Sequence, residues 1–263
     1  MDFKNIACAI EYDGTDYRGF QRQPATHGLT IQGELERAIE RIGQEFCVVT
    51  GAGRTDAGVH ASGQVINFRT RSRLTPEVWL RALNAVLPST IAVRWTREVP
   101  ERFHARFSAR SRSYRYTIWN ESVPTALYAR YSYHCPSPLD VDAMQAACQY
   151  LLGRKDFGAF GHSPEDANPR RPGRHHCVRT MLEARCERQE NTAFIHCHFT
   201  ADAFLTGQVR RMVGTLVLVG QQRLCLDEFA QIVQRAEKTH PGSAAPPHGL
   251  CLVQVDYPDE VWS

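Results

Sequence analysis

Long apolar runs are missing from this chain of 263 residues. The longest, residues 212–220, falls well short of the ~20 residues that a membrane-spanning helix needs. Residues 1–9 also lack the charged, apolar and small-residue regions of a secretory signal peptide. We therefore expect a cytoplasmic protein with no membrane segment.

Paired cysteines are missing as well. The nine cysteines are scattered singly, in an odd number and without a C-x-x-C spacing. Zinc sites and disulfide frameworks draw on such pairs, so we expect reduced, mostly buried thiols. Two segments, His175-His176-Cys177 and His196-Cys197-His198, could be read as metal ligands, but no second pair completes a four-ligand site. The sequence predicts strand histidines and no bound metal.

A strong charge of one sign is also missing, because the formal net charge is only +3. The distribution of charge is more informative than its sum. Residues 94–116 contain seven arginines against two glutamates, with aromatic residues between them; the arginines are Arg94, Arg97, Arg102, Arg106, Arg110, Arg112 and Arg115. This mixture fits phosphate contacts combined with base stacking. The alternative is a solvated strand-and-turn surface.

Hydrophobic periodicity divides the chain into interspersed strands and helices. Helical spacing behind a capping residue predicts helices after Thr30, Thr75 and Asp140. Two further helices are expected at residues 208–220 and 226–237, and strands at residues 6–12, 48–49, 65–68, 91–95, 114–119, 194–199 and 250–255. Because strands and helices do not alternate regularly, the expected fold class is α+β. The two halves share an order of elements, which predicts two similar lobes, residues 1–105 and 106–263.

The most unusual segment is residues 51–60, where three glycines surround Arg54 and Asp56. In an extended segment, two residues at this spacing point the same way, so the guanidinium would lower the pKa of the carboxyl. An ionised, oriented carboxylate is what a base or a nucleophile requires. The alternative is a glycine-rich turn with a surface ion pair.

Several motifs resemble one family, the bacterial tRNA pseudouridine synthase A family. Its signature loop resembles Gly53-Arg54-Thr55-Asp56-Ala57-Gly58-Val59-His60-Ala61, followed by Gly63-Gln64-Val65. Further similar segments are Glu11-Tyr12-Asp13-Gly14-Thr15, Phe103-His104-Ala105-Arg106-Phe107-Ser108-Ala109, Arg112-Ser113-Tyr114-Arg115-Tyr116 and Asp202-Ala203-Phe204-Leu205 with Val209-Arg210. The resemblance runs from about Ile6 to Tyr257, nearly the whole chain.

The resemblance implies the pseudouridine synthase fold: two lobes sharing a mixed, mainly antiparallel sheet flanked by helices, with an active-site cleft between them. The N-terminal lobe would carry the catalytic Asp loop, and the C-terminal lobe would complete the cleft and the dimer surface. The implied function is isomerisation of uridines at positions 38–40 of the tRNA anticodon stem-loop, by a homodimer without a cofactor.

The resemblance also assigns roles to single residues. Asp56 would be the essential carboxylate, Arg54 would organise the site, and Tyr114 would pack against the target base. Arg210 would reach toward Asp56. Without the resemblance, Tyr114 reads as a strand aromatic of the core and Arg210 as a solvated helix-end arginine. Whether Asp56 adds to the base, attacks the sugar carbon or removes a sugar proton stays open.

A uridine in a paired stem must be extruded, at a cost of roughly a few kcal/mol that phosphate contacts must offset. Candidates for these contacts are Arg22, Arg106, Arg110 and the arginines of residues 162–176, each of which could instead be an ordinary surface arginine. Two rival functions remain: an RNA-binding or RNA-folding protein without turnover, and a synthase of the same chemistry acting on another RNA.

Overall fold

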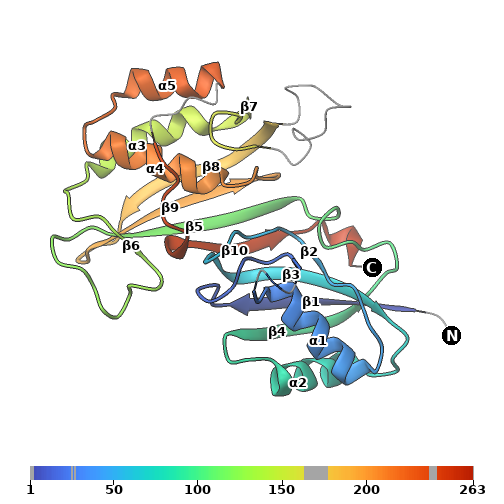
Figure 1. The fold of residues 1–263 in the computed structure, drawn as a ribbon. Coiled ribbons are helices and arrows are strands. Elements are labelled where there is room, and N and C mark those ends of the chain that lie inside the picture. Colours follow the sequence, from blue (N-terminus) through green and yellow to red (C-terminus); the bar gives the residue numbers. More distant parts are fainter. Residues whose placement is uncertain (1–2, 25, 27, 163–176, 237–241, 263) are drawn as a thin grey trace. The chain divides into compact units, whose positions relative to one another are not determined.

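The computed structural model describes residues 3–24, 26, 28–162, 177–236 and 242–262. The chain folds into two compact units, Met1–Arg112 with Cys251–Ser263, and Ser113–Leu250. Helices and mostly antiparallel strands are interspersed in both, which confirms the α+β class (Figure 1). The first unit extends beyond Ala105 and takes in the C-terminal strand, whereas the sequence assigned both regions to the second lobe.

The first unit is built on a sheet with the strand order β4-β1-β3-β10. Strand β1 (Lys4–Tyr12) pairs antiparallel with both β3 (His60–Thr70) and β4 (Ile91–Val99). Strand β10 (Leu250–Asp256) pairs in parallel with β3, and the short β2 (Thr50–Gly51) pairs with β3 in the antiparallel sense. These pairings place the strands at the two ends of the chain in one sheet.

Two strand predictions in this region need correction. Residues 48–49 are not in a strand, because pairing with β3 begins only at Thr50. Strand β3 begins at His60, five residues before the expected start. Its first residues, which include the buried His60 and Ala61, pair with β10, a contact that local sequence does not reveal.

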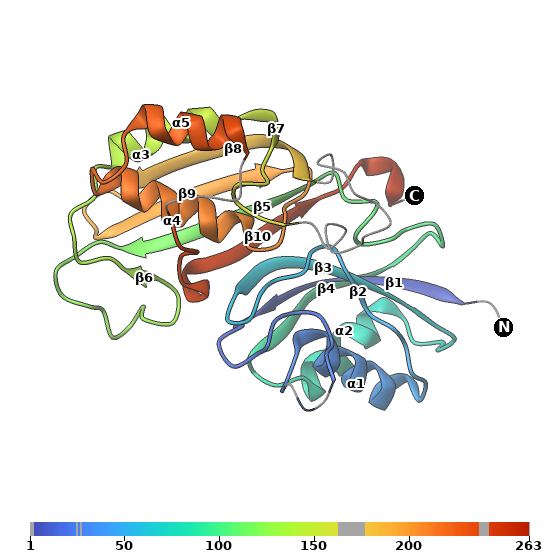
Figure 2. The same cartoon turned by 45° about the horizontal axis from the view of Figure 1, so that its top comes forward.

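Two helices cover one face of this sheet (Figure 2). Helix α1 (Ile31–Gly43) begins at the predicted cap, where the Thr30 hydroxyl accepts from Gly33 N at 3.3 Å. Helix α2 (Pro76–Val86) has proline in its first turn, but Thr75 makes no side-chain cap hydrogen bond. Trp79 of α2 packs edge-to-face against Phe68 of β3, with ring centroids 5.1 Å apart.

The opposite face carries an aromatic cluster around Phe103. Its ring lies 5.3 Å from that of Tyr257 and 5.1 Å from that of Trp262. Phe103 and Tyr257 are buried against Ala7 and Val65 of the sheet. The cluster therefore holds residues 103–109 against the first unit together with the end of the chain.

The second unit has the strand order β5-β9-β8-β7. The strands are β5 (Ser111–Trp119), β7 (Gly153–Asp156), β8 (Val178–Arg188) and β9 (Phe194–Ala201), and β7–β8 and β8–β9 are antiparallel pairs. The two-residue β6 (Tyr133–His134) runs parallel to β5. The expected strands at residues 114–119 and 194–199 are thus confirmed.

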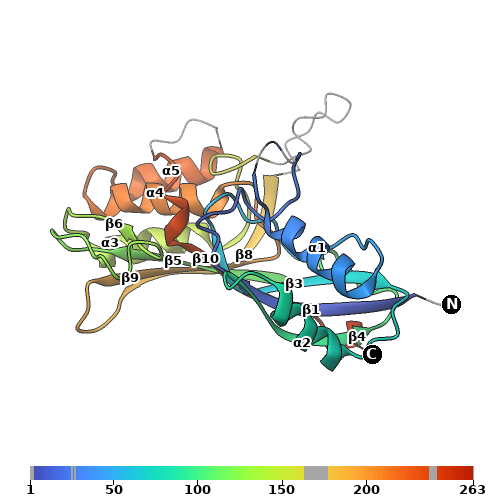
Figure 3. The ribbon, with the colours of Figure 1, turned by 60° about the horizontal axis from the view of Figure 1, so that its bottom comes forward.

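Helices cover one face of these strands (Figure 3). They are α3 (Val141–Cys148), α4 (Gln208–Gly220) and α5 (Leu226–Arg235). Asp140 caps α3 as expected, accepting from Ala143 N at 2.9 Å, and α4 has the predicted bounds. Among the described residues, no helix combines the length and the apolar character of a bilayer span.

The cysteines are all free thiols, and seven of the nine are buried, as expected. Three of them meet between α3 and the sheet: Cys186 Sγ lies 3.6 Å from Cys148 Sγ and 2.8 Å from Cys197 Sγ. His196 and His198 are strand residues of β9, as predicted, while His175 and His176 lie outside the described residues. Within the described ranges, no group of three or more potential ligands is arranged to hold a metal ion.

Candidate active site

The Asp56 loop, residues 52–59, connects β2 to β3. Its first turn is held by one buried amide: Gly53 N donates to Gln64 Oε1 at 3.3 Å, and Gln64 Nε2 donates to Gly53 O at 2.7 Å. Gln64 is fully buried, so these two hydrogen bonds are shielded from competing water. The loop therefore leaves the sheet in one fixed direction.

The centre of the loop is anchored at Thr55, immediately before Asp56. Its carbonyl accepts from Phe20 N at 3.0 Å, and its hydroxyl lies 2.8 Å from the buried Tyr12 hydroxyl. Asp56 O then accepts from Val59 N at 3.2 Å, which closes a turn. The partly buried Asp56 carboxylate thus extends from a backbone that is constrained on both sides.

The return half of the loop packs against residues 13–20 so closely that only glycine fits. A Cβ on Gly14 would lie 2.0 Å from Val59 O. Gly58 has φ of 75°, a left-handed conformation that favours glycine, and its N–H donates to Tyr17 O at 3.3 Å. The glycines of both segments therefore permit the contact that shapes the loop.

The expectation that Arg54 and Asp56 point the same way assumed an extended strand. The spacing rule applies to a β-strand, and residues 54–56 lie in none. Arg54 is exposed, and its pKa is lowered by partial desolvation and then by the positive charge of Arg106. Arg54 therefore belongs to a cationic surface.

Arg112 is one of the seven arginines that the sequence suggested for phosphate contacts, but the structure gives it a different, internal role. It is buried, and its guanidinium donates to Ala52 O at 3.3 and 3.0 Å, to Ala109 O at 3.2 Å, and to Arg106 O. One side chain thus joins the start of the Asp56 loop to residues 106–109. A signal was available, because Arg112 shares the alternating register of the buried Tyr114 and Tyr116 on β5.

The other predicted arginines of the first unit differ in their surroundings. Arg106 and Arg110 are exposed, and the Arg106 guanidinium lies 5.6 Å from the Phe107 ring centroid. Arg22 Nη1 instead lies 3.3 Å from Oε2 of the buried Glu36. A buried carboxylate without a counter-charge is costly, so Arg22 has a structural task at this position.

Tyr114 and Arg210 belong to the second unit. Tyr114 is buried and packs edge-to-face on Phe204, with ring centroids 5.1 Å apart. Arg210 lies in the first turn of α4, and its Nε donates to Ala245 O at 2.7 Å. Of the predicted loop at residues 162–176, residues 163–176 lie outside the described residues.

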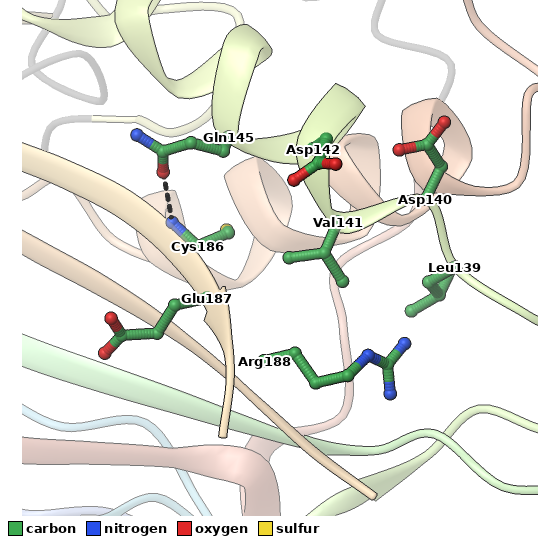
Figure 4. A pocket seen from close by; sticks show the side chains of 8 residues that line it. All are labelled: Leu139, Asp140, Val141, Asp142, Gln145, Cys186, Glu187 and Arg188. Carbon is green, nitrogen blue, oxygen red and sulfur yellow. Dashed lines mark hydrogen bonds between the residues drawn. The ribbon is translucent and has the colours of Figure 1, made fainter. Parts of the chain in front are cut away.

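A surface hollow of about 600 Å³ lies in the second unit, between α3 and β8 (Figure 4). Asp140 and Asp142 line one side, and Glu187 and Arg188 line the other. Gln145 Oε1 accepts from Cys186 N at 2.8 Å across its floor. No residue with a role predicted from the sequence lines this hollow.

Comparisons with known proteins agree with these motifs. Residues 8–108 and 147–258 match the family described as tRNA pseudouridine synthase. The chain is 44% identical over 252 residues to tRNA pseudouridine synthase A of Moorella thermoacetica, covering 96% of this chain and 99% of the relative. It is 39% identical over 254 residues to tRNA pseudouridine synthase A of Acetivibrio thermocellus, covering 97% of this chain and all of the relative. The chain therefore belongs to the tRNA pseudouridine synthase family.

Proposed function

We propose that this protein isomerises uridines of the tRNA anticodon stem-loop, at positions 38–40, to pseudouridine, with Asp56 as the catalytic carboxylate. The observation that carries the proposal is the Asp56 loop. Gln64 holds the first turn of the loop, and Thr55, the residue before Asp56, is itself anchored by hydrogen bonds. The backbone that carries the partly buried Asp56 is therefore held in place. Such fixed positioning is what a catalytic group needs before substrate arrives.

The reaction breaks the bond between uracil N1 and ribose C1′ and forms a bond between uracil C5 and C1′. A proton leaves C5 and a proton is gained at N1, so no redox partner or cofactor is required. A carboxylate can add to the base, attack the sugar carbon or remove a sugar proton. All three routes use an oriented Asp56.

Other residues are proposed to bind the substrate. Tyr114 packs against the target base and Arg210 contributes a further substrate contact. Arg54 organises the site around Asp56, and the exposed Arg106 contacts RNA phosphates, because a bound anion would relieve its repulsion with Arg54. In this proposal the first unit supplies the carboxylate, the second completes the substrate site, and the protein works in the cytoplasm as a homodimer.

The first test is tritium release from an unmodified tRNA transcript labelled at uridine C5, comparing the wild-type protein with Asp56→Asn. Asparagine keeps the shape of the side chain and removes its charge. We expect release by the wild type alone, with equal circular dichroism spectra for both proteins. Mapping of pseudouridine in the product by carbodiimide treatment and reverse transcription then identifies the modified positions.

A second comparison separates catalysis from binding. Asp56→Ala should retain most of the tRNA affinity and form no product, because dispersed phosphate contacts dominate binding. Equal loss of both would assign Asp56 a structural role. Wild-type protein that binds tRNA without releasing tritium from any anticodon arm would support the rival function, an RNA-binding protein without turnover.

A further inference from the structure

Residues 104–109, here called the Phe107 tip, form a rigid turn on the first unit. His104 Nδ1 accepts from Arg106 N at 3.2 Å and from Phe107 N at 3.3 Å. His104 and Ser108 are joined twice, by His104 N to Ser108 Oγ at 3.1 Å and by Ser108 N to His104 O at 2.9 Å. The tip therefore has an internal hydrogen-bond network of its own.

Buried side chains from distant parts of the sequence hold the same tip. Asn67 Oδ1 accepts from Ala105 N at 2.9 Å, and the Tyr257 hydroxyl donates to Ala105 O at 2.7 Å. The Arg112 guanidinium donates to Arg106 O and to Ala52 O, which links the tip to the Asp56 loop. The position of the tip is thus fixed relative to the loop that carries Asp56.

This rigid support displays an apolar ring to solvent. The Phe107 side chain is 76% exposed, and the Arg106 guanidinium lies 5.6 Å from its ring centroid. The His104 ring lies 4.4 Å from that of Phe107, centroid to centroid, and most of the Phe107 side chain stays in water, so its burial contributes little to folding. A ring held in place beside the positive charge of Arg106 is complementary to a ligand with a flat apolar face and an anionic group next to it. An unpaired nucleotide has both.

We propose that Phe107 is a stacking platform for an unpaired base of the RNA substrate, with Arg106 binding a phosphate next to this base. The inference rests on the proposed function for the identity of the RNA as tRNA. It assigns to the Phe107 tip the recognition of a splayed nucleotide close to the Asp56 loop. Proteins bind single-stranded RNA by this combination of aromatic stacking and phosphate contacts.

The test compares tRNA affinities of three single variants. Phe107→Leu removes the aromatic face and keeps an apolar side chain, whereas Phe107→Trp restores an aromatic face. Phe3→Leu is the matched control, because Phe3 is also exposed, at 52%, with an arginine guanidinium (Arg71) 4.6 Å from its ring centroid. We expect Phe107→Leu to raise the Kd for an unmodified tRNA transcript about tenfold, with Phe107→Trp and Phe3→Leu near the wild type.

Two further measurements examine the mode of contact. With a transcript containing 5-iodouridine, irradiation should attach a nucleotide to the peptide that contains Phe107. Arg106→Gln should reduce the slope of log Kd against log salt concentration by about one. A blunt RNA duplex without unpaired bases should bind the wild type and Phe107→Leu equally, since it offers no base to stack.

Three results would overturn the inference. One is an unchanged Kd for Phe107→Leu, and another is an equal loss of affinity for the duplex. The third is a Phe107→Leu protein that sediments as a monomer where the wild type is a dimer, which would make the tip a contact between two copies. Tritium release distinguishes this inference from the proposed function. If RNA binding depends on Phe107 but the wild type releases no tritium, the stacking role of Phe107 is supported and the proposed isomerase activity is contradicted.

Discussion

The Tyr12 hydroxyl lies 2.8 Å from the Thr55 hydroxyl, at the residue that precedes Asp56. Both side chains are buried, so the hydrogen bond forms away from solvent. Tyr12 ends the central strand β1, and the contact therefore transmits the rigidity of the sheet to the Asp56 loop. A catalytic carboxylate must be held at a fixed position relative to the substrate atom on which it acts, and this requires a backbone that does not move.

Removal of this hydrogen bond should affect catalysis more than binding. We expect Tyr12→Phe to lower the free energy of unfolding by about 1 kcal/mol and to reduce kcat in the tritium assay with little change in tRNA affinity. Tyr17→Phe is a matched control, because the Tyr17 hydroxyl lies 2.8 Å from the Thr90 hydroxyl. A similar loss of kcat in both variants would argue against a specific role for the Tyr12 contact.

Arg112 should contribute far more to stability than an exposed arginine on the same strand. Arg112→Met leaves the carbonyls of Ala52 and Ala109 without this buried donor, and we expect a loss of about 2 kcal/mol or more in urea unfolding. Arg115→Met should change stability by less than about 0.5 kcal/mol, because Arg115 is exposed. Equal effects would show that the Arg112 contacts are energetically neutral.

Acidification should destabilise the second unit through His196 and His198. Partial burial lowers the pKa of each imidazole below its ordinary value of 6.5, with further lowering by nearby positive charges such as Arg185. The unfolded chain therefore binds more protons as pH falls through 6.5, and stability is lost until the folded-state pKa values are passed. The double variant His196→Gln/His198→Gln should show a smaller fall in Tm between pH 7 and pH 5 than the wild type.

Much of the fold was predictable because the signals are local. Thr30 and Asp140 are capping residues next to helical periodicity, and both helices begin where this pattern predicts. The start of β3 was not predictable, since residues 60–61 pair with a strand from the far end of the chain. A pairing partner so distant in sequence leaves no trace in a local pattern.

For the candidate site too, some features were predictable from the sequence and others depend on the folded structure. The sequence singled out the Asp56 loop by its glycines, whereas its close packing against Gly14, where an added Cβ would lie 2.0 Å from Val59 O, is a property of the folded unit. The predicted pairing of Arg54 with Asp56 stays a prediction, but its premise of strand geometry does not hold, because residues 54–56 lie in a loop. The structural task of Arg22 depends on the burial of Glu36, a property of the assembled unit.

The hydrogen bond from the Tyr257 hydroxyl to Ala105 O joins two segments that are synthesised at different times. Tyr257 and β10 leave the ribosome only after the whole second unit has been made, yet both belong to the first unit. Until then, the nascent first unit lacks a strand of its sheet and one support of the Phe107 tip. The first unit can therefore complete its sheet and the support of the Phe107 tip only after the second unit has been synthesised.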